Sequence, residues 1–125
     1  DLYAGLGGHY DADVWENKLY RNDGVANHYI SIELVGTRAN RNAIGGRATA
    51  FANGRAICSH RQSGFGFGSS NSPALHLGLG AATRIDSLHV VWPGGTRQHF
   101  YDLPLDCAIR VIEGQTHYQT IRRSP

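Results

Sequence analysis

The residues best suited to metal chemistry in this sequence are its seven histidines: His9, His28, His60, His76, His89, His99 and His117. No two of them have the HExxH or HxxxH spacing of a zinc motif, so only the pairing of neighbouring strands could gather them. His76 and His89 are the pair best placed for that, because both fall in strand-like stretches. We expect no metal or haem site.

The two cysteines, Cys58 and Cys107, lie far apart and have no CxxC, CxxCH or zinc-ligand spacing. They form either a disulfide or two buried free thiols, and their spacing does not decide between the two.

The acids and serines form no complete catalytic or calcium motif. Asp11, Asp13 and Glu16 offer oxygen ligands at close spacing, but the glycine and the third aspartate of a calcium loop are missing, which indicates a solvated turn. Several serines lie near His60 and His76 without a GxSxG nucleophile elbow. We therefore expect that the chain is not an enzyme and holds no cofactor.

Two glycine-rich loops carry the candidate partner-binding residues: Arg38, Arg41, Phe65, Phe67 and Asn71. In residues 36–46 (GTRANRNAIGG) the arginines could hold a carboxylate or phosphate through paired donors. We favour a structural β-arch there, in which asparagines bond the loop backbone, glycines take positive φ, and the arginines are exposed or paired with acids such as Glu33.

The GFGFG stretch at residues 64–68 has neither the preceding strand nor the following helix of a dinucleotide-binding loop. Its two phenylalanines either meet a partner or a sugar face, or pack inward. We favour inward packing, because small β domains use loop aromatics to complete their cores.

Short stretches of period-two alternation must position these groups. Residues 28–35 (HYISIELV) put Ile30, Ile32 and Leu34 on one face. Asn53-Gly54 and Pro93-Gly94-Gly95 separate further alternating runs and predict two hairpins. With 75–79 and 108–113, about seven short strands result, which predicts an all-β, antiparallel sandwich or partly open barrel. The expected core is Ile30, Ile32, Leu34, Leu75, Leu77, Leu88, Val90, Trp92, Ile109 and Val111.

Composition supports one main domain. The chain has 125 residues, of which 41% are hydrophobic, and 16 glycines without a collagen period indicate many turns. A net charge of +2 with interspersed signs argues against nucleic-acid binding, and no apolar stretch is long enough for membrane insertion. The chain contains no methionine, so we expect it to be a piece of a longer protein.

Several of these loops, in order and spacing, resemble the ASPIC/UnbV domain. They are GTRANRNAIGG with the RATA that follows, QSGFGFGSSNSPALHLGLG at 62–80, and VVWPGG at 90–95, and the resemblance covers about residues 27–114. It implies a C-terminal β module that follows FG-GAP/VCBS repeats in extracytoplasmic proteins. Residues 1–24, with DLY and NKLYRNDG, are similar to the tail of the last such repeat. The expected division is an incomplete propeller blade at 1–25 and an ASPIC/UnbV-like domain at 26–125.

This resemblance implies a non-catalytic interaction or adhesion module that docks on its propeller or on a partner protein. A carbohydrate-binding accessory module and a structural subunit of a large extracytoplasmic complex are the alternatives. Exposed, coplanar aromatics among Tyr10, Trp15, Phe65, Phe67 and Tyr101 would favour sugar binding, and burial of all of them would favour docking. Calcium would belong to the upstream repeat. An oxidising location permits a disulfide between Cys58 and Cys107, which we expect as a local feature because the family is not associated with cysteines there.

Overall fold

The computed structural model describes residues 1–6, 8, 10–12, 14–24 and 26–121, and these residues form strands without any helix. In that described part, accordingly, no helix is available that could span a membrane. The strands are β1 (Leu2–Ala4), β2 (Lys18–Tyr20), β3 (His28–Val35), β4 (Arg47–Ala52), β5 (Arg55–His60), β6 (Leu75–Gly80), β7 (Ser87–Val91), β8 (Arg97–Phe100), β9 (Cys107–Ile112) and β10 (Tyr118–Ile121).

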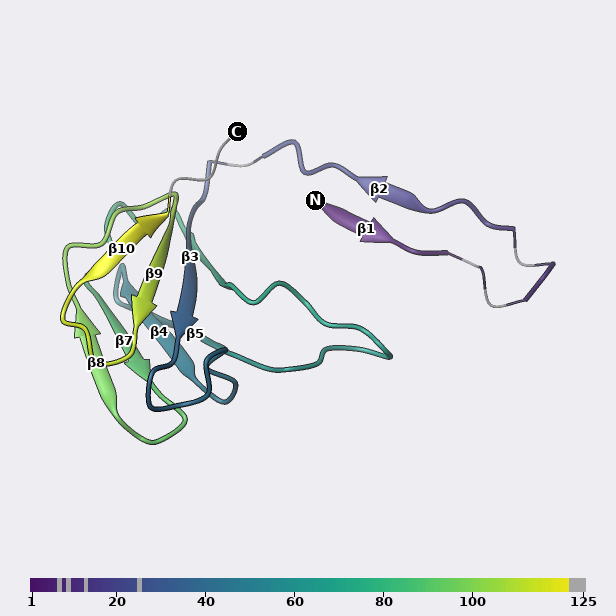
Figure 1. Cartoon of the computed structure of the whole chain (residues 1–125). Coiled ribbons are helices and arrows are strands. Elements are labelled where there is room, and N and C mark those ends of the chain that lie inside the picture. Colours follow the sequence, from purple (N-terminus) through teal and green to yellow (C-terminus); the bar gives the residue numbers. More distant parts are fainter. Residues whose placement is uncertain (7, 9, 13, 25, 122–125) are drawn as a thin grey trace.

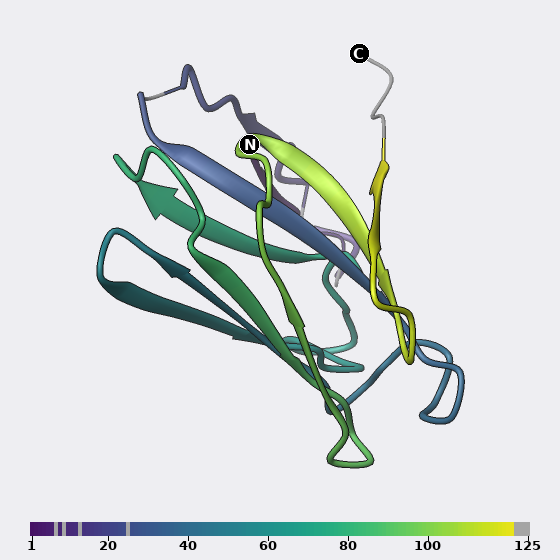
Figure 2. The ribbon, with the colours of Figure 1, turned by 90° about the vertical axis from the view of Figure 1, so that its left-hand side faces the viewer.

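Eight of the strands form two four-stranded sheets that pack face to face (Figures 1 and 2). The first has the order β10-β9-β3-β6 and the second the order β5-β4-β7-β8. The predicted all-β sandwich is confirmed. Two details differ from the prediction: β3 and β9 pair in parallel, and β10 is an additional strand. Parallel pairing is feasible because a long crossover separates β3 from β9: it forms all four strands of the second sheet and β6 of the first.

The core lies between the two sheets and contains all ten residues that the alternation predicts. Trp92 is the largest fully buried side chain, 1% exposed. Strand β4 contributes the small residues Ala48, Ala50 and Ala52, all buried, which leave room for larger side chains from the facing sheet.

Both predicted hairpins are confirmed. Asn53 and Gly54 have φ values of 50° and 69° and connect β4 to β5, with Ala52 opposite Arg55. At the second turn, the Trp92 backbone N–H donates to the Thr96 carbonyl at 2.9 Å. In the first turn, positive φ at both central residues matches the twist of paired strands, and in the second turn Gly95 has a φ of 85°.

Strands β1 and β2 form a separate two-stranded sheet, drawn apart from the sandwich in Figure 1. The pairs are Leu2 with Tyr20 and Tyr3 with Leu19. All four side chains are exposed, as is Trp15 in the connection. The described part of residues 1–24 therefore presents an apolar surface.

Candidate functional site

An open groove of about 540 Å³ lies between β5, β6 and the loop that joins them, residues 61–74. Gln62, Phe65, Asn71, Ser72 and His76 are among the residues that line it. It combines one aromatic ring with amide, hydroxyl and imidazole groups and has the size of a small-ligand site. Such a lining can cover an apolar face and exchange hydrogen bonds with hydroxyl groups. Two candidate residues from different parts of the loop, Phe65 and Asn71, meet here.

The tip of this loop is a tight turn closed on itself. The Phe65 backbone N–H donates to the Ser69 carbonyl at 3.1 Å, and the Ser69 hydroxyl donates to the Phe65 carbonyl at 2.7 Å. Gly66 and Gly68 supply positive φ. The prediction that Phe65 and Phe67 pack inward is wrong: both are exposed, Phe67 completely. The turn holds both rings away from the core, which Trp92 and its neighbours already fill. Figure 1 shows the loop between β5 and β6 extending away from the sandwich.

The other glycine-rich loop, residues 36–46, wraps around a carboxylate of its own chain. Glu113 Oε2 accepts hydrogen bonds from the backbone N–H groups of Thr37, Arg38 and Ala39 at 2.9, 2.8 and 2.8 Å. The Thr96 hydroxyl donates to Oε1 at 3.4 Å. Glu113 is only 7% exposed. These donors, the Ala39 N–H above all, lower the pKa of the Glu113 carboxyl against the opposing effect of burial.

Within the same loop, Asn40 confirms the predicted β-arch. Its side-chain amide donates to the Ile44 carbonyl at 2.9 Å and its Oδ1 accepts from the Ile44 N–H at 2.8 Å. Only glycine fits at position 36, because a Cβ there would lie 2.2 Å from the Asn40 carbonyl oxygen. The loop is therefore a built structural element.

The arginines of this loop are exposed, and Arg38 borders a second hollow beside Glu113. The expected partner Glu33 is bonded elsewhere: its carboxylate accepts from Arg110 on the neighbouring strand at 2.9 Å. The parallel pairing of β3 with β9 places Glu33 directly opposite Arg110, which explains the different partner. Arg38 and Arg41 do not join Phe65 and Asn71 in the groove.

Cys58 and Cys107 are free, so the disulfide expectation is wrong. Cys58 lies exposed on β5 of the second sheet, and Cys107 lies half-buried on β9 of the first. Their Sγ atoms contact other groups, His60 Nε2 at 3.8 Å and the Pro104 carbonyl at 3.5 Å. Burial raises the pKa of the Cys107 thiol, and the Asp106 carboxylate raises it further.

The prediction that strand pairing brings His76 and His89 together is also wrong. His76 lies on β6 of the first sheet and His89 on β7 of the second. His89 instead faces His99 of β8, with ring centroids 4.2 Å apart. Burial, followed by the charge of His99, lowers the pKa of the His89 imidazole. In the hairpin after β7, Trp92 pairs with Thr96. Counting three residues from this pair along each strand, away from the turn, leads to His89 and His99, so the position of the turn is the sequence signal for this contact.

Among the residues that the structure describes, no three His, Cys, Asp or Glu side chains converge to hold a metal ion. Asp11 and Glu16 are exposed, while Asp13 and His9 lie outside the described residues.

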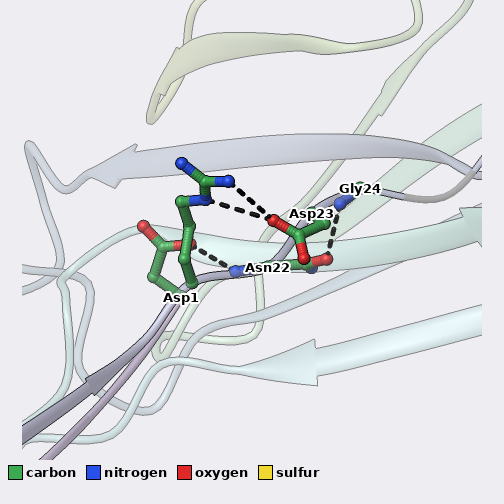
Figure 3. A network of polar contacts seen from close by, with 5 residues as sticks. Asp1, Asn22, Asp23 and Gly24 are labelled. Atoms are coloured by element: carbon green, nitrogen blue, oxygen red, sulfur yellow. Dashed lines mark hydrogen bonds and ion pairs between the residues drawn. The ribbon is translucent and has the colours of Figure 1, made fainter.

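The N-terminal hairpin is closed by polar contacts, shown in Figure 3. Asp1 Oδ1 accepts from the Asn22 backbone N–H at 2.8 Å, and Arg21 pairs with Asp23 at 3.0 Å. The Gly24 N–H donates to Asn22 Oδ1 at 2.9 Å. The Asp1 carboxylate thus caps the end of β2.

A comparison with protein-family models matches residues 36–117 to the model described as ASPIC and UnbV. No curated protein matches the chain. The matched residues run from the loop around Glu113 to the start of β10 and so include most of the sandwich and the whole groove. The chain belongs to the ASPIC and UnbV family.

Proposed function

We propose that this chain is a non-catalytic interaction module of an extracytoplasmic protein, and that it docks through its N-terminal hairpin onto an adjacent β-propeller or a partner protein. The observation that carries this proposal is the exposure of apolar side chains on both faces of the hairpin. Leu19 is 68% exposed and Trp15 is 75% exposed.

Two features support docking. A two-stranded sheet is marginally stable alone, so β1 and β2 gain stability from a covering surface. Clustered exposed apolar side chains are typical of interaction sites. The resemblance of residues 1–24 to the end of an FG-GAP/VCBS repeat makes a propeller blade the occupant that we propose.

Sedimentation of the chain with and without a purified FG-GAP propeller tests this proposal. We expect a complex, protection of the backbone amides of β1 and β2 from hydrogen exchange within it, and weaker binding by Leu19→Ser. Ile44→Ser, an exposed aliphatic on the sandwich, is the matched control and binds normally. A complex that forms equally well with Leu19→Ser would refute hairpin docking.

Carbohydrate binding in the groove is the second candidate. Tyr10, Trp15, Phe65, Phe67 and Tyr101 are all exposed, which is one of the two conditions, exposure and coplanarity, under which sugar binding is favoured. The Phe65 ring and the Asn71 amide provide a stacking surface and hydrogen bonds in one place.

Titration calorimetry with neutral oligosaccharides tests this candidate. Phe65→Ala is expected to abolish binding, whereas Tyr29→Ala, an exposed aromatic outside the groove, is expected to leave it intact. Sugar binding in the groove is rejected if no neutral sugar gives a heat of binding, or if Phe65→Ala binds with the same affinity as the wild type.

A further inference from the structure

The outward face of the sheet β5-β4-β7-β8 carries a grid of basic side chains. Cross-strand pairing forms one row in the order His60, Arg47, Val91, Arg97. A second row beside it has the order Cys58, Thr49, His89, His99. We call these two rows the basic face.

No acid occupies an outward position of these four strands, all of whose residues are described. Within the described chain, neither the Arg47 nor the Arg97 side chain makes a hydrogen bond or ion pair, whereas the Arg21, Arg84 and Arg110 side chains all have carboxylate partners. Two unpaired guanidinium groups on a face without acids produce a positive local potential in a molecule whose net charge is only +2.

Geometry allows the cations to act together. Neighbouring strands are about 4.8 Å apart, so Arg47 and Arg97 flank Val91 at a separation of about 10 Å between Cα atoms. A hollow of about 160 Å³ lies between them, lined also by His89 and His99. The row from His60 to Arg97 crosses all four strands and therefore fits an elongated anion with repeated charges.

We propose that the basic face binds an anionic polysaccharide, with sulfate or carboxylate groups held by Arg47 and Arg97. Guanidinium groups bind such oxyanions through paired donors. A nucleic-acid strand fits less well, because it binds on stacking rings. Phe51, the single outward-facing Phe, Tyr or Trp within these four described strands, is half-buried, and its ring centroid lies 4.6 Å from that of His89.

Calorimetry of the full chain with a dextran sulfate oligosaccharide, and with unsulfated dextran of the same length, tests the proposal. We expect the sulfated chain alone to bind at this face, with an affinity that falls as salt is added. Arg47→Gln with Arg97→Gln is expected to lower the affinity roughly tenfold or more. The matched control, Lys18→Gln with Arg21→Gln, removes the same charge from the N-terminal hairpin and is expected to leave the affinity unchanged.

Two controls complete this test. Circular dichroism verifies that each variant folds, and Arg97→Gln alone, on the exposed edge strand β8, replaces the double variant if that variant unfolds. An oligonucleotide of the same charge as the glycan serves as a competitor. Unchanged affinity of the arginine variants overturns the proposal, as does an oligonucleotide of equal charge that displaces the glycan at equal or lower concentration. The outcomes with the arginine variants are independent of hairpin docking and of sugar binding in the Phe65 groove, because neither Arg47 nor Arg97 lines that groove.

Discussion

The carboxylate of Glu113 accepts a hydrogen bond from the backbone N–H of Ala39 at 2.8 Å, across 74 positions of sequence. Through this contact and the two beside it, the end of β9 holds the loop between β3 and β4. The arginines of residues 36–46 could have held an anionic ligand. Instead, the backbone N–H groups of this loop bind a carboxylate of the same chain, that of Glu113.

Replacing Glu113 by Ala is expected to destabilise the fold by about 2 kcal/mol, because three backbone donors lose their acceptor. Urea unfolding measures the change. Glu33→Gln, which breaks a half-exposed pair with Arg110, is the control and is expected to cost less than about 1 kcal/mol. Equal effects of the two substitutions would contradict the role of Glu113 as the centre of the loop.

Stability is expected to fall with acidification through the same carboxyl group. Its pKa in the folded chain lies below the ordinary value of 4.5, so its contribution is complete above that pH. Below it the unfolded chain takes up the proton first, and the contribution disappears as the pH falls through the folded pKa. Unfolding free energies of the wild type and Glu113→Gln, measured from about pH 7 to about pH 3, are expected to converge at the acidic end. A constant difference over the range would be the contrary result.

Replacing each of the two tryptophans by Ala is expected to change the free energy of unfolding by very different amounts. Trp92 is 1% exposed, and its indole N–H donates to Gln98, so Trp92→Ala is expected to cost about 3–5 kcal/mol. Trp15→Ala is the control, with an expected change within about 0.5 kcal/mol for the sandwich. Chemical unfolding followed by circular dichroism provides both values. A large loss with Trp15→Ala would mean that the hairpin belongs to the cooperative unit of the sandwich.

Two adjacent glycines in the turn after Trp92 differ in what their backbone requires. Gly95 has a φ of 85°, so Gly95→Ala is expected to cost about 1 kcal/mol. Gly94 lacks a positive φ, and no atom lies within 4 Å of an added Cβ, so Gly94→Ala is expected to be close to neutral. Thermal unfolding distinguishes them, and a reversed order would contradict the described turn.

Thiol titration is expected to find two free thiols per denatured, unreduced chain. In the native protein the exposed Cys58 is expected to react first, and Cys107 slowly, because burial and the raised pKa keep it protonated. Cys58→Ser removes the fast phase. Zero thiols in the denatured chain would demonstrate a disulfide.

Much of the fold followed from local pattern. Alternation placed Ile30, Ile32 and Leu34 inside, and Asn53-Gly54 defined a turn, because side-chain direction and turn geometry depend on neighbours in sequence. Once the pairing of Trp92 with Thr96 fixes the register of the second hairpin, His89 lies opposite His99. In the same way, the pairing of Ala52 with Arg55 places Arg47 opposite His60.

Local sequence pattern thus predicted most of the strands, their inward faces and both hairpins, but neither β10 nor the contact of His89 with His99. Only the three-dimensional structure showed that β4 lies beside β7, which joins two basic hairpins into one face, and that Glu113 closes the loop around Ala39. It also kept Cys58 and Cys107 on different sheets and turned Phe65 and Phe67 outward. The physical reason is that contacts between distant segments depend on how whole sheets pair and pack, which no local periodicity records.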